Sequence, residues 1–343
     1  MTEQEVQILE AMLERLEKCE ASNKLLMDSN RALINSNRVL SDALNALSAE
    51  FEHYTDNAPY EICDPGSDKL SIFYPQIKSF DETLSDLLNG NKSLCRFGDG
   101  EFACINGKLR AKFTSVFFPE LASRLLEVLN SSEDNIMIAL ADNYGDLAKY
   151  SPQSRREIRN YMTPEIRLEQ MALLKKDVVY SNAYITRPYM FLYNSKDKMQ
   201  DYWHRIKTLW DGRNVIIIEG SNTGMGVGND LLDNCKEIKR IIAPSVDAYK
   251  YYETILNKAL EQPDDSLFLI ALGPAATVLA YDLAKTGRRA IDIGHLDIEY
   301  EWMLHDSYRS KIPGKYVNEV DDGDSPEPIT DQRYRDQILC EIL

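Results

Sequence analysis

The chain has 343 residues, of which 44% are hydrophobic, enough for one large domain or two ordinary ones with a substantial core. Its net charge of -16 argues against broad contact with the phosphate backbone of DNA or RNA and against a polybasic membrane anchor. The N-terminus lacks the apolar core of a signal peptide, and no apolar run approaches the ~20 residues of a membrane-spanning helix. Six cysteines without a C-x-x-C pair favour neither a zinc site nor a disulfide framework. We therefore expect a cytoplasmic globular protein that binds no nucleic acid and has no transmembrane segment.

The N-terminal residues 1–56 carry a heptad repeat. Counting from Leu9, the a positions are Leu9, Leu16, Asn23, Asn30, Asn37, Leu44 and Phe51, and the d positions are Met12, Cys19, Leu26, Leu33, Leu40 and Leu47. A buried asparagine pairs best with its twin in a parallel two-stranded register, so three consecutive asparagines beside leucines predict a parallel homodimer through a coiled coil. A helix packed on its own domain is the alternative.

A change of composition follows the heptads. Pro59, Pro65 and Gly66 predict that the helix ends and that residues 57–68 form a linker. We expect a catalytic domain over residues 69–317, and an acidic loop with a C-terminal segment over residues 318–343.

Short apolar runs alternate with amphipathic helical patterns in the predicted domain. The runs indicate strands at 93–97, 135–140, 177–185, 214–220, 238–244, 266–273 and 289–294, and the patterns indicate helices at 119–130, 247–262 and 274–287. Several runs are apolar on both faces, as in strands covered by helices on each side. This alternation predicts an α/β fold, a Rossmann-like mainly parallel sheet with helices on both faces, in which ligands bind at the carboxyl ends of the strands.

A cluster of charged residues follows the first of these strands. Asp99 and Glu101 form an Asp-x-Glu pair after Gly98, in what the glycines predict to be a tight turn. Two carboxylates are hard oxygen ligands for Mg²⁺ or Mn²⁺, ions that leave positions for water and substrate phosphates. Arg96, three residues before Asp99, could neutralise a phosphate oxygen. An exposed acidic turn is the alternative.

Glycine-rich and basic segments follow other strands. After 214–220, Gly224, Gly226 and Gly228 predict a turn that opens a helix, whose N-terminus would suit a phosphate. A purely structural turn is equally compatible with that spacing, which lacks the dinucleotide fingerprint. Asn229 and Asp230 could be capping residues there.

Two further strand ends carry candidate contacts. After 266–273, Gly273 and Pro274 open a predicted helix whose small residues would let a ligand approach, and a plain connection is the alternative. Arg187 precedes Pro188 after the strand at 177–185, where a surface arginine is the alternative. A second cluster of ionisable groups follows the last strand: His295, Asp297, Glu299 and Glu301 alternate with apolar residues.

The motifs together resemble a known family. "RFGDGE", "ITRPYM", "IIIEGSNTGMGVGNDLLDNCKEIKRIIAP", "ALGPAATVLAYDLA" and "AIDIGHLDIEYEWML", in this order over about residues 75 to 305, resemble the GT-D-type glycosyltransferases, a family first catalogued as a domain of unknown function. The resemblance implies metal-dependent transfer of a sugar, glucose or a related hexose, from a UDP-sugar. It implies a glycan or glycoprotein acceptor in bacterial adhesin glycosylation or surface-polysaccharide synthesis.

The resemblance also carries over residue roles. It places the family's metal-binding Asp-x-Glu motif on Asp99 and Glu101, and its Gly-His motif on His295 as a further metal or diphosphate contact. The family's Gly-x-Gly-Asn-Asp segment falls on Gly226, Gly228, Asn229 and Asp230 as donor contacts, and Thr223 of the same loop is a further candidate.

The expected reaction is attack of an acceptor hydroxyl on C1 of the sugar, with the nucleoside diphosphate leaving. A metal on Asp99 and Glu101, aided by Arg96 or Arg187, would stabilise the leaving group, and Asp297 or Glu299 would deprotonate the acceptor in an inverting mechanism. Two alternatives stay open. One is a Rossmann-like enzyme that uses a nicotinamide cofactor or S-adenosylmethionine; the other is a non-catalytic scaffold that joins a coiled coil to a nucleotide-sugar-binding module.

Overall fold

The computed structural model describes residues 2–62, 74–108, 115–145, 147–192, 195–317, 320, 323 and 327–342. The chain divides into two compact units, Met1–Leu70 and Ser71–Leu343. Across the described residues, no helix combines the length and the apolar character that a membrane crossing requires.

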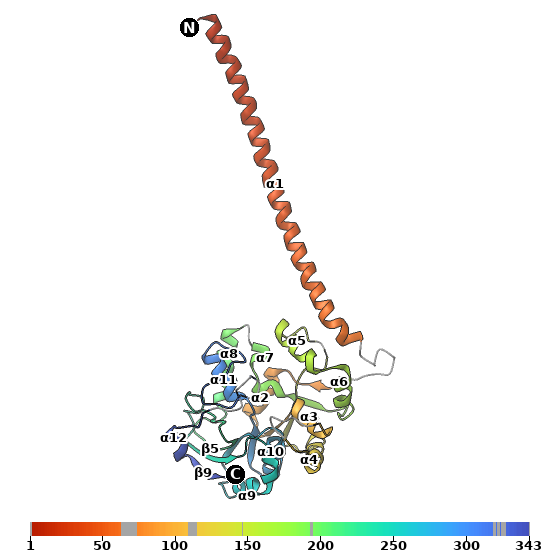
Figure 1. Ribbon diagram of the computed structural model, residues 1–343, viewed down its shortest axis with the longest axis vertical. Coiled ribbons are helices and arrows are strands. Elements are labelled where there is room, and N and C mark those ends of the chain that lie inside the picture. Colours follow the sequence, from red (N-terminus) through yellow and green to blue (C-terminus); the bar gives the residue numbers. More distant parts are fainter. Residues whose placement is uncertain are drawn as a thin grey trace. The chain divides into compact units, whose positions relative to one another are not determined.

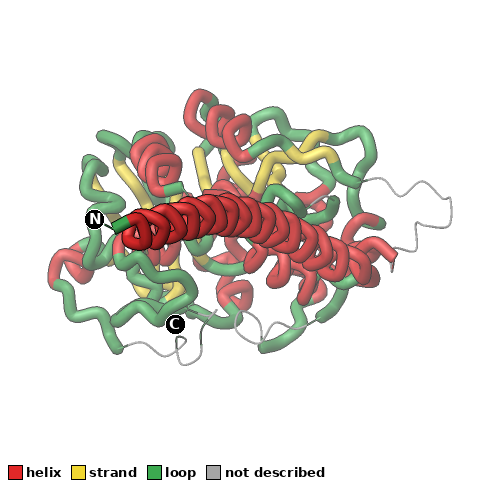
Figure 2. Tube along the Cα trace, turned by 90° about the horizontal axis from the view of Figure 1, so that it is seen from above, coloured by secondary structure: helices red, strands yellow, loops and turns green. Residues whose placement is uncertain are grey.

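The first unit is the helix α1, Glu3–Ile62, which runs as one unbroken helix (Figure 2). It confirms the long N-terminal helix, which continues past Pro59 and ends at Ile62, within the segment 57–68 predicted as a linker. A proline inside a helix removes one backbone hydrogen bond and can kink the helix, but the loss of one bond does not by itself end the helix. The apolar a and d side chains are exposed, Leu33 by 59% and Leu40 by 67%.

The second unit is built on a sheet with helices around it (Figure 1). The sheet has nine strands in the order β1-β4-β3-β2-β8-β7-β5-β6-β9. Every pairing is parallel, which confirms the predicted α/β class. The strands are β1 Gln76–Ile77, β2 Ser93–Phe97, β3 Ile136–Leu140, β4 Val179–Asn182, β5 Asn214–Gly220, β6 Glu237–Ala243, β7 Leu267–Ala271, β8 Arg289–Asp292 and β9 Ile338–Glu341.

Helices flank this sheet. They are α2 Phe80–Asn89, α3 Asp99–Ile105, α4 Pro119–Leu129, α5 Pro152–Tyr161, α6 Pro164–Met171, α7 Tyr189–Leu192, α8 Lys196–Lys207, α9 Tyr252–Leu260, α10 Pro274–Lys285, α11 Leu296–Leu304 and α12 Gln332–Asp336, with short 3₁₀ turns η2 Ala183–Thr186 and η3 Ala248–Tyr251. A proline opens α4, α5, α6 and α10, where its missing N–H costs nothing. Nearly every residue of α10 is buried, because this helix packs against β2 and β8 in the centre of the unit.

The sheet has two halves that meet at the β2–β8 pair. Strands β1 to β4 lie on one side of this junction, and β5 to β9 on the other. From β2 the chain continues to β3 on one side of the junction, whereas from β8 it continues to β9 on the other side, so the connections diverge here. Ligands of open α/β sheets bind at the carboxyl ends of strands at such a switch point.

Two strands, β1 and β9, were not predicted from the sequence. β1 has two residues, and β9 is a short edge strand with alternating burial that pairs with β6. The C-terminal segment therefore completes the sheet.

Candidate active site

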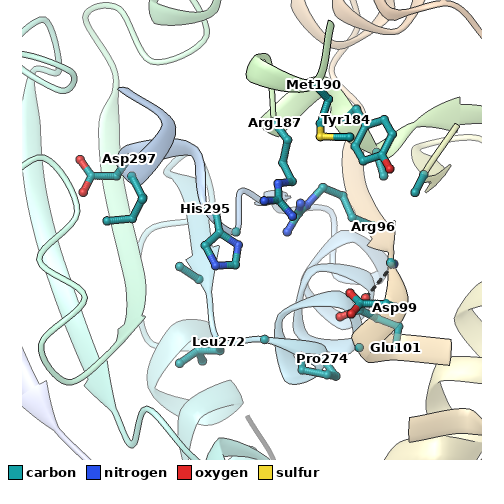
Figure 3. Close-up of a pocket in the computed structure, with 18 of the residues that line it drawn as sticks. Arg96, Asp99, Glu101, Tyr184, Arg187, Met190, Leu272, Pro274, His295 and Asp297 are labelled. Carbon is teal, nitrogen blue, oxygen red and sulfur yellow. Dashed lines mark hydrogen bonds between the residues drawn. The ribbon is translucent and has the colours of Figure 1, made fainter. Parts of the chain in front are cut away.

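A cavity of about 740 Å³ opens at the carboxyl ends of the strands (Figure 3). This volume falls in the range of small-molecule sites, ~300–1,000 Å³. Residues at or just after seven strand ends line it: Arg96, Ala141, Ala183, Gly220, Ser245, Ala271 and Gly294. It brings together ten predicted site residues, namely Arg96, Gly98, Asp99, Glu101, Arg187, Thr223, Gly273, Pro274, His295 and Asp297. Five other predicted residues, all described, lie outside its lining: Gly226, Gly228, Asn229, Asp230 and Glu299.

Asp99 and Glu101 occupy the first turn of α3, so the glycine turn predicted there is a helix start. Gly98 is the N-cap, and its backbone N–H donates to Glu101 Oε2 at 2.8 Å, which satisfies one of the free donors of a helix N-terminus. The Asp99 side chain is exposed and Glu101 is half-buried. Burial, with a smaller contribution from the charge of Asp292, raises the pKa of Glu101 to about 7.

Arg96 connects the two halves of the sheet. Its Nε donates to the Asp292 carbonyl at 2.8 Å, Nη2 pairs with Asp292 Oδ1 at 2.9 Å, and Nη1 donates to Thr186 Oγ1 at 2.6 Å. Gly294 makes room for this guanidinium, because a Cβ there would lie 2.0 Å from Arg96 Nη2, and its φ of +49° disfavours other residues. Arg96 thus links β2 to Asp292 of β8 and to Thr186 beneath the cavity, and we call these residues the cavity floor. Asp292 and Gly294 were missed as site residues from the sequence, although both lie within the predicted strand 289–294.

Arg187 and His295 bring basic side chains to the cavity wall (Figure 3). The Arg187 guanidinium points toward that of Arg96. Its Nε lies 3.4 Å from Glu299 Oε1, and Glu299 Oε2 accepts from the Tyr189 N–H at 3.2 Å. Glu299 is fully buried and orients Arg187 from behind the wall.

Asp297 lies at the wall, but its carboxylate points away from His295 (Figure 3) and is bonded on both oxygens. Oδ1 accepts from the Gly226 N–H at 2.9 Å and from Asn229 Nδ2 at 3.0 Å, and Oδ2 pairs with Lys315 Nζ at 2.6 Å. Lys315 Nζ also lies 2.8 Å from Glu301 Oε1. Lys315 gave no signal in the sequence, since its partners come from distant segments.

The glycine-rich loop, residues 221–229, does not open a helix, and the prediction of one was wrong. Gly224, Gly226 and Gly228 have φ of +59°, +74° and +81°, which takes the backbone out of the right-handed helical path. The loop also uses its own N–H groups: those of Thr223 and Val227 donate to loop or strand carbonyls, and those of Met225 and Gly226 to buried carboxylates.

Asp230 follows this loop on its outer side. Its carboxylate pairs with Lys207 Nζ at 2.8 Å and accepts from the Tyr300 hydroxyl at 2.6 Å. It therefore connects the segment to α8 and α11 rather than to the cavity.

Two tyrosines add hydroxyls to the cavity lining. Asn143 Nδ2 donates to the hydroxyl of Tyr184 at 3.1 Å and to that of Tyr161. Burial, then Tyr184, raises the pKa of Tyr161 well above its usual value, and the charge of Asp99 adds to the increase. Both tyrosines therefore stay neutral phenols.

The carboxylates of Asp99 and Glu101 offer oxygen ligands at the cavity edge. Within the described parts of the chain, no group of three His, Cys, Asp or Glu residues is arranged to hold a metal ion. A cation here would therefore take further ligands from water and substrate, as Mg²⁺ and Mn²⁺ do with phosphate-bearing substrates.

A family model described as "Glycosyltransferase GT-D fold" matches residues 94–320, which include the cavity lining from Arg96 to Tyr316. The chain belongs to the GT-D-fold glycosyltransferase family. This confirms the resemblance inferred from the motifs.

Curated relatives and solved structures agree with this membership. The "Probable glycosyl transferase Gly" of Streptococcus gordonii is 35% identical over 289 residues, 82% of this chain and 42% of the relative. "Glycosyltransferase GlyD" of Streptococcus pneumoniae serotype 4 is 31% identical over 270 residues, 78% of this chain and 33% of the relative. The chain thus spans less than half the length of these two relatives.

Among solved structures, "A New Glycosyltransferase (DUF1792) from Streptococcus sanguinis" is similar with a TM-score of 0.72 and 33% identity, over 79% of this chain and 100% of that one. "The highly conserved domain of unknown function 1792 has a distinct glycosyltransferase fold" describes a second, with a TM-score of 0.70 and 30% identity, over 78% of this chain and 95% of that one.

Proposed function

We propose that this GT-D protein is a metal-dependent glycosyltransferase that moves a sugar, glucose or a related hexose, from a UDP-sugar to a hydroxyl of a glycan or glycoprotein. The observation that carries the proposal is the Asp99–Glu101 pair. It opens into a cavity of nucleotide-sugar size at the switch point of the sheet, inside the segment that the family model matches.

Asp99 and Glu101 would hold Mn²⁺ or Mg²⁺. When bound, such an ion supplies positive charge that stabilises a leaving diphosphate. Burial raises the pKa of Glu101 to about 7, and a cation beside it would lower that pKa and favour the ionised carboxylate as a ligand.

Other residues of the wall are suited to the diphosphate. The Arg187 guanidinium, oriented by Glu299, and the imidazole of His295 are donors for phosphate oxygens. Gly273 and Pro274 place the N-terminus of α10, with its partial positive charge, on the same cavity.

Asp297 and Glu299, the sequence-based candidates for the acceptor base, fit a positioning role better. Glu299 is buried against Arg187 and Tyr189, and both oxygens of Asp297 are already bonded. An acceptor in adhesin glycosylation or surface-polysaccharide synthesis follows from the family resemblance, and the streptococcal origin of the two relatives is compatible with it.

The second copy of this chain is the proposed partner of α1. The a and d side chains of α1 are exposed, and a parallel pair would bury them with the asparagines matched. In that register Arg15, at a g position, faces Glu20 of the second copy at the following e position, which adds an attractive pair.

Titration calorimetry tests the proposed reaction class. We expect the protein to bind UDP in the presence of Mn²⁺, and to bind neither NAD nor S-adenosylmethionine. Asp99→Asn should abolish the Mn²⁺-dependent part of UDP binding. Asp134→Asn is the matched control, because Asp134 is exposed just before the amino end of β3, away from the cavity. Binding of NAD in place of UDP, or equal UDP binding by Asp99→Asn, would contradict the proposal.

A further inference from the structure

We propose that Lys315 is a positioning residue that fixes the glycine-rich loop as a wall of the nucleotide site. This inference rests on the proposed function, because it assigns the loop to the same UDP-sugar cavity. The loop glycines then serve the ligand through the shape of the loop rather than by offering their N–H groups to a phosphate.

Lys315 is the cation of a buried network at the base of the loop. It is 4% exposed, and its Nζ bonds both Asp297 and Glu301, which are 3% and 4% exposed. Buried carboxylates stay charged at low cost only when a cation and hydrogen-bond donors compensate them. Lys315 therefore lets Asp297 accept bonds from the loop as a carboxylate.

The loop depends on these carboxylates directly. Asp297 Oδ1 holds the backbone of Gly226, and Asn229 Nδ2 bridges Asp297 at 3.0 Å and Glu301 Oε1 at 2.7 Å. These bonds fix the loop at two points on α11, a helix that also borders the cavity.

A second buried pair holds the neighbouring residue of the loop. Glu219 Oε2 accepts from the Met225 N–H at 2.8 Å, Arg240 Nη2 donates to the Met225 carbonyl at 2.8 Å, and the two side chains pair at 2.6 Å. The two networks clamp adjacent residues, Met225 and Gly226. Loss of the Lys315 network would leave the loop attached on one side.

The clamped loop presents its Thr223 to the cavity. Tyr316, directly after Lys315, donates its N–H to the Asn222 carbonyl at 3.0 Å, and Tyr316 and Thr223 both line the cavity. A shift of residues 315–316 therefore moves two parts of the wall together. Small displacements of positioning groups carry large costs in binding and turnover.

The test combines hydrogen exchange with calorimetry on the full chain. In Lys315→Met we expect faster exchange at the Gly226 amide, with the Met225 amide still protected by Glu219, and UDP affinity in the presence of Mn²⁺ lower by roughly tenfold. Arg289→Met is the matched control: Arg289 is a buried cation at the amino end of β8, bonded to the Leu87 and Lys92 carbonyls. It should lower the melting temperature without changing either readout.

Asn229→Ala is the milder variant for the case in which Lys315→Met does not fold. It removes the bridge between loop and carboxylates while Lys315 still pairs with both of them, and a several-fold loss of UDP affinity is expected. Unchanged affinity in the variants beside normal binding by the wild type would overturn this inference alone. A wild-type protein that binds no UDP would overturn the proposed function and the inference with it.

Discussion

Replacement of Glu101 by glutamine should stabilise the metal-free protein at alkaline pH. Glutamine keeps the size of the side chain and an oxygen that can accept the Gly98 N–H, and it removes the charge. The pKa of Glu101 rises from 4.5 to about 7 in the folded protein. The folded state therefore holds this proton more tightly than the unfolded chain does. The contribution of protonated Glu101 to the free energy of unfolding is full below pH 4.5 and is lost as the pH rises through 7.

The size of the effect follows from this shift. The difference of 7 − 4.5, about 2.5 units, corresponds at ~1.36 kcal/mol per unit to a cost of roughly 3 kcal/mol for the ionised carboxylate above pH 7. Glutamine avoids that cost, and the hydrogen bond from the Gly98 N–H to the carboxylate is already included in this pKa. Glu101→Gln should therefore be more stable than the wild type by roughly 3 kcal/mol at pH 8, a gain that disappears near pH 4.

Urea unfolding at pH 4 and pH 8 in the presence of a chelator measures this difference. Asp134→Asn is the control for removal of an exposed carboxylate, and a change within about 0.5 kcal/mol is expected for it. Mn²⁺ added together with UDP, in the absence of the chelator, should stabilise the wild type and leave Glu101→Gln unchanged. A Glu101→Gln variant that is less stable than the wild type at pH 8, or equally shifted at both pH values, would refute the reasoning.

Two further predictions concern the cavity floor and the coiled coil. Gly294→Ala should lower the free energy of unfolding by about 2–4 kcal/mol in urea titrations, because the alanine Cβ would displace the Arg96 guanidinium and residue 294 has a positive φ. A variant as stable as the wild type would contradict the role of Arg96 at the β2–β8 junction. Leu33→Asp with Leu40→Asp should convert a dimer to a monomer in sedimentation equilibrium without loss of UDP binding, since both side chains occupy d positions of α1. An unchanged mass would exclude the heptad stripe as the dimer interface.

Much of the sheet was readable from local sequence. Seven strands were predicted close to their observed bounds, because β-branched apolar runs buried on both faces have few other stable conformations. The small, apolar α10 and its opening proline were equally visible. β9 was not, since a strand of four residues at the sheet edge is stabilised by its pairing with β6, and pairing is a tertiary property.

The candidate site was predictable in residue type and only partly in role. Parallel strands bring their carboxyl ends to one edge, so Asp99, Glu101, Arg187 and His295 meet in one cavity as expected. The functions of Arg96 and Asp297 depend on partners far along the chain, and no local pattern marks those pairings. The glycine-rich loop shows the same limit. A glycine-rich segment after a strand can either open a helix or form a loop with glycines of positive φ. Here the loop forms, because the buried carboxylates of Glu219 and Asp297 accept hydrogen bonds from its backbone.

Manganese binding followed by electron paramagnetic resonance, with UDP present, tests the central claim most directly. The wild-type protein should take up one Mn²⁺ per chain in a UDP-dependent manner, and Asp99→Asn and Glu101→Gln should each take up none under the same conditions. Equal uptake of Mn²⁺ by the wild type and both variants would show that these carboxylates do not hold the ion, and would contradict the account.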